Sequence, residues 1–238
     1  MDKTIPDLLA WPPRAAARLR VKVLKMQFHS MTNYNYLVID EATGQALVVD
    51  PAWQMDRIDE ALEEAQAELA GVLVTHSHPD HLNLAAPLAE QRRCPIWMSE
   101  REIEMCGFRH PRLQAIGSAP WFVGGMHVQP LLTPGHTPGC VCYLIGDNLF
   151  TGDVLFAEGC GVCPSVEAAH EMFGSLEYLK ALLDPQVRIY PGHSYGKVPG
   201  QLFEQVLRDN IYLHFRDRTS FANFRMRRMR GSINVFGQ

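Results

Sequence analysis

A cluster of histidines constrains this chain more than any other feature. Three imidazoles and a carboxylate fall within six residues of the stretch 75–81, whose sequence is THSHPDH. The apolar run 72–74 directly before it is typical of a buried strand, so the cluster lies where a strand ends and a loop begins. Alternate side chains of an extended chain point the same way, and the proline then forces a turn that presents the last two residues from a second direction. These converging nitrogen and oxygen ligands suit one or two borderline cations, with zinc first and iron or manganese as alternatives.

The composition limits the class of protein and its partners. With 238 residues, 47% of them hydrophobic, the chain can form one large α/β domain with a sizeable core. The net charge of −4 argues against a nucleic-acid partner. The sequence has no apolar run of about 20 residues, so we expect no membrane partner. Because prolines at positions 6, 12 and 13 interrupt the N-terminus, no signal peptide is expected and a cytoplasmic location follows.

The six cysteines indicate reduced thiols rather than a disulfide scaffold. They are scattered through a chain of ordinary length, at positions 94, 106, 140, 142, 160 and 163. Cys160 and Cys163 have the spacing of a zinc or redox motif, but no second pair of this spacing exists. We therefore interpret them as two ordinary thiols.

Strands and helices alternate in two halves of similar rhythm. This pattern favours an α/β fold of two sheets packed face to face, with helices outside. Strands are predicted at 20–26, 36–39, 46–49, 71–75, 95–98, 121–132, 141–145, 148–150 and 187–190. Helices are predicted at 56–69, 84–91, 100–106, 167–183 and 201–213, and a loop at 107–120.

Three later polar residues share the placement of the first cluster. His136, Asp153 and His193 each follow an apolar run that ends at a glycine-containing turn. Taken singly, each would be an ordinary turn residue. Because open α/β sheets place their sites at strand ends, the three together with the first cluster predict one shared site.

These residues carry a resemblance to the metallo-β-lactamase superfamily. The ligand pattern of that family is matched in full and in order by His76, His78, Asp80, His81, His136, Asp153 and His193. The resemblance implies a four-layer αβ/βα sandwich with two Zn²⁺ ions between the sheets. It also implies that His76, His78 and His136 hold one ion, that Asp80, His81 and His193 hold the second, and that Asp153 bridges them.

The chemistry implied by this site is hydrolysis. A pair of metal ions can generate hydroxide from water near neutral pH and hold a developing oxyanion. No cysteine or serine nucleophile is then needed, and Asp80 is the one side chain predicted to act in catalysis besides the metals. The related di-iron flavoproteins usually carry glutamate where this chain has His78, and histidine favours hydrolysis.

The branch of the superfamily is indicated by several further stretches. The segments 150–161 and 191–195 resemble glyoxalase II (hydroxyacylglutathione hydrolase), which cleaves thioesters. Val162 stands where that enzyme has a basic residue, and the chain after His193 is short for its helical substrate domain. The stretch 210–227 resembles the zinc hydrolases found with bacterial polyketide synthases. We therefore expect cleavage of acyl thioesters on carrier proteins, with glyoxalase II or a mononuclear-iron persulfide dioxygenase as alternatives. A metal-binding scaffold without catalysis is a third reading.

The expected partner is an acyl carrier protein or a small thioester. The arginines at 225, 227, 228 and 230 form a basic cluster, which is either a docking patch for an acidic carrier protein or a solvated terminus. Tyr195, next to the predicted ligand His193, is either a substrate-binding phenol or a packed aromatic. The predicted organisation is an extension at 1–19, a hydrolase domain at 20–215 and a short basic tail at 216–238.

Overall fold

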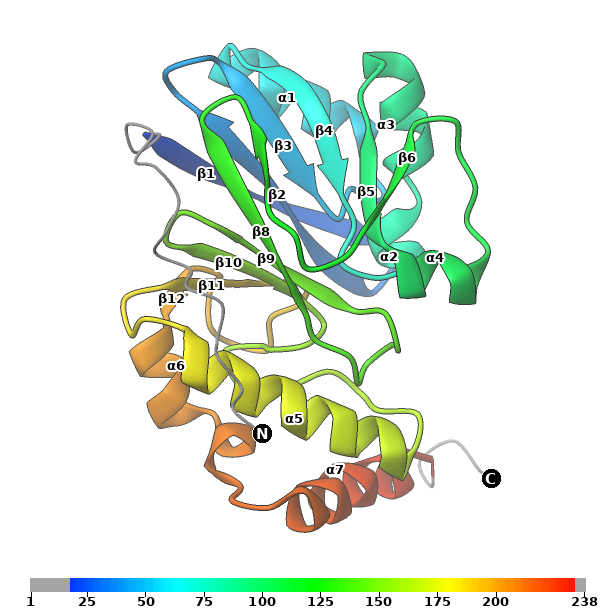
Figure 1. Ribbon diagram of the computed structural model, residues 1–238, viewed down its shortest axis with the longest axis vertical. Helices are drawn as coiled ribbons and strands as arrows, with labels where there is room; N and C mark the ends of the chain where they lie inside the picture. The colour runs from blue at the N-terminus through cyan, green and yellow to red at the C-terminus, as the bar shows by residue number, and fades with distance from the viewer. Residues whose placement is uncertain (1–17, 234–238) are drawn as a thin grey trace.

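Two six-stranded sheets form the centre of the molecule (Figure 1). The computed structural model describes residues 18–233, and only the backbone for 228–233. The first sheet has the order β1-β2-β3-β4-β5-β6, and the second has the order β12-β11-β10-β9-β8-β7. Strands of the first sheet are β1 (Leu19–Phe28), β2 (Met31–Asp40), β3 (Gln45–Val49), β4 (Glu68–Leu73), β5 (Ile96–Ser99) and β6 (Leu113–Ile116). Strands of the second are β7 (Trp121–Val123), β8 (Met126–Leu132), β9 (Val141–Ile145), β10 (Asn148–Gly152), β11 (Arg188–Pro191) and β12 (Gln201–Leu202).

Helices cover the outer face of each sheet, which confirms the predicted four-layer αβ/βα sandwich. On the first half these are α1 (Met55–Ala65), α2 (Pro79–Leu82), α3 (Ala85–Arg92) and α4 (Glu100–Cys106). On the second half they are α5 (Val166–Leu182), α6 (Phe203–Asp209), a 3₁₀ turn η1 (Ile211–His214) and α7 (Arg218–Ile233). Figure 1 shows α1 and α3 at one end of the molecule and α5, α6 and α7 at the other.

The inner strands of both sheets are buried on both faces, and their side chains belong to two different cores. In β2, Tyr36 and Val38 belong to the core between the sheets, whereas Leu37 and Ile39 belong to the core under α1 and α3. This alternation follows from the two-residue period of a strand. It explains why the strands appear in the sequence as continuous apolar runs rather than as alternating patterns.

Parallel pairing of strands places the site. In the first sheet β3 runs parallel to β4, and in the second sheet β10 runs parallel to β11. The carboxyl ends of each pair therefore meet at one edge, followed by Asp50, the histidine cluster, Asp153 and His193. The two edges are joined by a bond from the backbone N–H of Tyr34 to the carbonyl of Gly192 (2.9 Å).

Several predicted boundaries differ from the structure. The helix predicted at 56–69 ends at Ala65, because Gln66 turns into the left-handed region (φ 51°) and the chain enters β4 at Glu68. The predicted loop 107–120 contains β6, a short strand that depends on pairing with β5. The region 201–213 begins as β12 and is interrupted at Asn210, whose side chain accepts the N–H of Tyr212.

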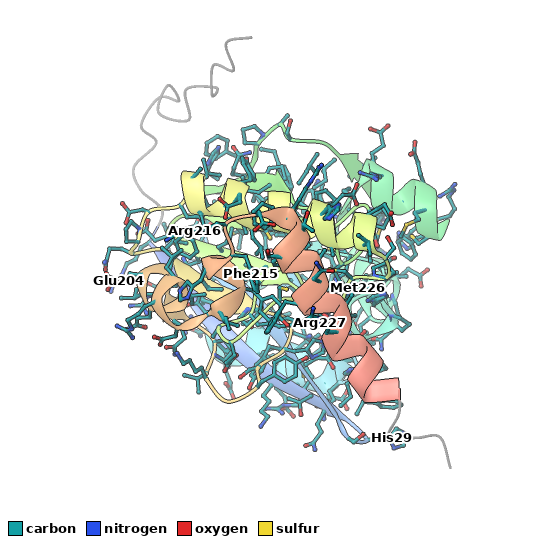
Figure 2. All side chains as sticks on the ribbon, turned by 90° about the horizontal axis from the view of Figure 1, so that it is seen from below. His29, Glu204, Phe215, Arg216, Met226 and Arg227 are labelled. Atoms are coloured by element: carbon teal, nitrogen blue, oxygen red, sulfur yellow. The ribbon has the colours of Figure 1, made fainter. Side chains whose placement is uncertain are left out.

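The stretch predicted as a basic tail contains α7. This helix packs along α5, and its Phe221 and Ala222 lie in the core beneath the second sheet. Figure 2 shows α7 lying across α5, with Met226 and Arg227 labelled on it. Within residues 18–233, no helix has the length and apolar character needed to cross a membrane.

Candidate metal centre

The seven predicted ligands converge between the two sheets, and the first three form one triad. His76 follows β4, His78 lies two residues later, and His136 comes from the loop after β8. The Nδ1 atom of His78 lies 3.1 Å from Nε2 of His76 and 2.9 Å from Nε2 of His136. Three imidazole nitrogens therefore face one point, and we call these residues the histidine triad.

Asp80, His81 and His193 form a second group, the mixed triad. Pro79 begins the short helix α2, which carries Asp80 and His81, and the ring centre of His81 lies 4.1 Å from that of His76. Oδ2 of Asp80 lies 3.2 Å from Nε2 of His193 and 3.5 Å from Nε2 of His81. One carboxylate oxygen and two imidazole nitrogens thus form a second cluster of potential ligands.

Asp153 lies between the two triads. Its Oδ1 is 3.5 Å from Nε2 of His81, and its Oδ2 is 3.6 Å from Nε2 of both His136 and His193. The left-handed turn at Gly152 (φ 48°) directs Asp153 to this place. A Cβ at Gly192 would lie 2.4 Å from His81 and 2.7 Å from Asp153, so only glycine leaves room for their contact.

The donor atoms fit divalent metal ions. Nε2 of His81 and Oδ1 of Asp153 are buried without any hydrogen-bond partner, a costly arrangement that coordination to a cation would relieve. Nδ1 of His136 donates to the carbonyl of Val162 and Nδ1 of His193 to that of Thr32, each at 2.8 Å. These bonds leave the Nε2 lone pairs facing the centre, which is the arrangement of metal-bound histidines.

Asp50 supports the centre, although it is not among the site residues predicted from the sequence. Its Oδ2 accepts from Nδ1 of His81 at 2.9 Å and from the hydroxyl of Thr75 at 2.7 Å. Its Oδ1 accepts from the backbone N–H of Thr75. Although it is close to His76 and His81, its oxygens are occupied by these donors, so it orients ligands. Its place directly after an apolar run was the same signal that identified Asp153.

Glu102 of α4 joins two ligand-bearing loops. It is fully buried, and its Oε1 accepts from the backbone N–H (2.8 Å) and hydroxyl (2.6 Å) of Ser77. Its Oε2 accepts from the hydroxyl of Thr137 (2.7 Å) and the N–H of Gly139 (3.1 Å). Nothing in the sequence distinguishes this glutamate from its exposed neighbours on the helix. It fixes both loops of the histidine triad.

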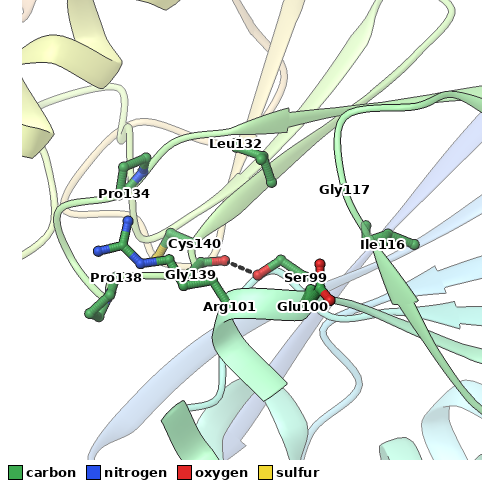
Figure 3. A pocket seen from close by; sticks show the side chains of 10 residues that line it. All are labelled: Ser99, Glu100, Arg101, Ile116, Gly117, Leu132, Pro134, Pro138, Gly139 and Cys140. Carbon is green, nitrogen blue, oxygen red and sulfur yellow. Dashed lines mark hydrogen bonds between the residues drawn. The ribbon is translucent and has the colours of Figure 1, made fainter. Parts of the chain in front are cut away.

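A second hydrogen bond reaches the same loop from the residue before α4. The hydroxyl of Ser99 donates to the carbonyl of Gly139, as Figure 3 shows. Both residues line a small, largely apolar hollow of about 180 Å³. The hollow lies behind the loop that carries His136, so it belongs to the support of the site.

The two triads differ in electrostatics in the metal-free protein. Burial, reinforced by the neighbouring imidazoles, lowers the pKa of His76 well below its usual value. Burial would also lower the pKa of His81, but Asp153, Asp50 and Asp80 raise it to about 9. At neutral pH the imidazole of His76 is therefore neutral, whereas that of His81 is doubly protonated and positively charged.

Asp80 remains ionised over a wide pH range. Burial raises the pKa of its carboxyl, but hydrogen bonds from His193 and Asn33 and the charge of His81 outweigh this and lower it strongly. The same contact with Asp80, together with Asp153, raises the pKa of His193 against the opposing effect of burial. An ionised Asp80 suits a metal ligand.

A cavity of about 500 Å³ opens beside the metal centre. Asp153 and His193 lie in its wall, and Tyr195 and Arg225 lie in the wall as well. Tyr195 is 71% exposed and contacts Phe156 with ring centroids 5.4 Å apart, so it lines the rim rather than the core.

The placement of Arg225 corrects one prediction. It was grouped with three other arginines in a basic cluster, either a docking patch or a solvated terminus, but it is only 6% exposed because α7 turns it toward the segment around Gly161. Arg227 is exposed, and the side chains at 228 and 230 lie outside the described residues.

Comparisons with known proteins agree with this geometry. The sequence profile described as "Metallo-beta-lactamase superfamily" matches residues 31–193. The chain is similar to a "Probable polyketide biosynthesis zinc-dependent hydrolase BaeB" of Bacillus velezensis, with 44% identity over 84% of this chain and 91% of that protein. It is 37% identical to a hydroxyacylglutathione hydrolase of Shewanella baltica, over 68% of this chain and 62% of that enzyme. Among solved structures, ETHE1 from Myxococcus xanthus is similar with a TM-score of 0.76 and 29% identity, over 86% of this chain and 90% of that one.

Proposed function

The chain belongs to the metallo-beta-lactamase superfamily and is a metal-dependent hydrolase, and we propose that its substrates are acyl thioesters on carrier proteins of polyketide biosynthesis. The similarity to a named polyketide hydrolase over nearly the whole length of both chains supports this substrate class. The chain spans only 62% of the hydroxyacylglutathione hydrolase, so glyoxalase II activity is the second candidate. We also propose that the protein works in the cytoplasm, together with its carrier protein.

We propose two zinc ions, one in the histidine triad and one in the mixed triad, with Asp153 between them. The observation that carries this proposal is the contact of Asp153 with both groups at 3.5–3.6 Å. The single-iron alternative needs neither Asp80 nor His81 as a ligand, yet both turn their ligand atoms to the same centre as His193. When bound, zinc would polarise a carbonyl and lower the pKa of water, so that hydroxide would be available as the nucleophile near neutral pH.

The residues of the chain then position the substrate and keep the carboxylate of Asp80 ionised. The cavity beside Asp153 and His193 admits the thioester, with Tyr195 and Phe156 along its wall. Asp80 stays ionised because of its lowered pKa, so its role is that of a ligand and at most a weak proton acceptor. A thiol such as that of cysteine has a pKa near 8.5, so a thiolate is a stable leaving group that departs without help from a general acid.

The test compares three substrates at equal concentration. Zinc-loaded protein should hydrolyse an acyl group on a carrier protein, and on pantetheine, faster than S-lactoylglutathione. Protein stripped by a chelator should lose this activity and regain it when zinc is added back. Efficient cleavage of S-lactoylglutathione without carrier activity would decide for glyoxalase II instead.

A further inference from the structure

Arg225 is a buried cation with no carboxylate partner. It is 6% exposed, and no ion pair joins it to any acidic residue between positions 18 and 233. Its Nε donates to the carbonyl of Gly161 at 2.9 Å, and its guanidinium lies 5.9 Å from the ring centre of Tyr212. These contacts hold the guanidinium in place but bring no carboxylate of the described residues within 4 Å of it, and a buried charge without such a partner is costly.

The guanidinium lies in the wall of the cavity that also exposes the metal centre. Arg225, Asp153 and His193 line the same space of about 500 Å³. A ligand that reaches the mixed triad is therefore within the same cavity as the cation. Arginine presents several N–H donors in a planar fork that matches carboxylate and phosphate oxygens.

Glu158 limits where an anion can lie in this cavity. It lines the same wall, its Oε1 accepts from the backbone N–H of Lys197, and its Oε2 is buried without a partner. Glu158 makes no ion pair with Arg225 within 4 Å. Its negative charge repels an anion from that part of the wall and directs it to the Arg225 end.

We propose that Arg225 is an anion-binding residue of the substrate cavity, which selects thioesters that carry a carboxylate or phosphate group. This inference rests on the proposed thioesterase function. The anion has two sources, a carboxylate on the acyl chain or the phosphate of a phosphopantetheine arm. In both cases the anion pairs with Arg225 in place of a carboxylate of the protein. The thioester carbonyl then lies toward Asp153 and His193.

Three thioesters separate the two sources. Acetyl-pantetheine is uncharged, succinyl-pantetheine has a carboxylate on the acyl chain, and acetyl-phosphopantetheine has a phosphate on the arm. The wild-type protein should favour one charged substrate over acetyl-pantetheine by about tenfold in kcat/KM, roughly 1.4 kcal/mol. Arg225→Gln should remove this preference while acetyl-pantetheine is cleaved within about threefold of the wild-type rate. Arg225→Lys, which keeps the charge, should restore part of it.

Arg227→Gln is the matched control, since Arg227 is exposed on the same helix. It should leave all three rates unchanged. The inference is overturned if the wild type shows no preference for a charged substrate. It is equally overturned if Arg225→Gln slows all three substrates alike, because the residue would then only support the segment around Gly161.

A binding measurement keeps this test separate from the proposed function. Succinate and inorganic phosphate are added to zinc-loaded protein, and the shift in Tm is recorded. Arg225→Gln should lose a stabilisation that the wild type and Arg227→Gln retain, even if no thioester is cleaved. Equal shifts in all three proteins would overturn the inference, whereas absence of thioester cleavage alone would overturn the proposed function.

Discussion

The histidine triad and the mixed triad lie next to each other but are built from different chemistry. The first contains three imidazoles, and burial lowers the pKa of His76 and, despite Asp153, that of His136. The second contains Asp80, and the carboxylates around it raise the pKa of His81 to about 9 against the effect of burial. At neutral pH the lowered pKa values leave His76 and His136 with free lone pairs, whereas His81 must lose a proton before it can bind a cation.

The residues that hold the two triads in place also differ. Glu102 holds both loops of the histidine triad through backbone and hydroxyl donors and touches no ligand directly. In the mixed triad the predicted ligands are bonded directly: Nδ1 of His81 donates to Asp50, and the side-chain amide of Asn33 donates to Asp80. The difference teaches that each triad has its own supporting residues, Glu102 for the first and Asp50 and Asn33 for the second, which makes the two halves of the site separable by mutation.

Asp80→Ala should have the largest effect, because it removes a ligand of the mixed triad alone. We expect at least about a hundredfold loss of kcat, roughly 2.7 kcal/mol of barrier. Metal analysis should find that one zinc equivalent remains. The control Asp147→Ala removes an exposed carboxylate in the turn between β9 and β10 and should change neither value. Two retained equivalents with near-normal activity in Asp80→Ala would refute the role of the mixed triad.

Glu102→Ala should weaken the other half of the site. It leaves the donors of Ser77, Thr137 and Gly139 without their acceptor. By comparison with other residues that orient ligands, we expect about 10- to 100-fold weaker zinc binding at the histidine triad. Competition with a chelator measures this, and Glu102→Gln, which keeps the shape and one acceptor oxygen, should lose less. If Glu102→Ala weakened zinc binding at the mixed triad alone, Glu102 would not be the support of the histidine triad.

Proton release should distinguish the two triads in the wild type. A folded pKa of about 9 means that His81 holds its proton at pH 7 and below, and releases it as the pH rises through 9. Zinc binding to the mixed triad at pH 7 should therefore release about one proton more than binding to the histidine triad. Calorimetry in buffers with different ionisation enthalpies measures this number, with Asp80→Ala reporting the histidine triad alone. Equal release by both sites would remove the proposed electrostatic difference.

The smallest effect is expected from the two buried thiols Cys160 and Cys163, the first of which lies in the wall of the cavity. Burial raises the pKa of Cys160, and it raises that of Cys163 to about 11, so both remain protonated at neutral pH. Cys160→Ala and Cys163→Ala should keep turnover within about tenfold, or 1.4 kcal/mol. Mass spectrometry of the protein after rapid quenching tests the same point. An acyl group found on either cysteine would contradict a mechanism without a protein nucleophile.

The sequence singled out the residues that converge at the centre more readily than the residues that support them. His136, Asp153 and His193 were identifiable because each follows an apolar strand at a turn, a local pattern. Glu102 was not, since its burial depends on two loops distant in sequence from α4. Similarly, β6 exists through its pairing with β5, and Arg225 faces the cavity because α7 packs on α5. Such tertiary contacts leave no periodic signal in the chain.

Titration of metal-free protein with zinc tests the two-triad account most directly. Bound zinc and thioesterase activity are measured on the same samples. We predict that activity is low at one equivalent per chain and reaches its maximum at two, because the cavity opens onto His193 of the mixed triad and onto Asp153, which lies between the triads. Full activity at one equivalent, with Asp80→Ala as active as the wild type, would contradict it.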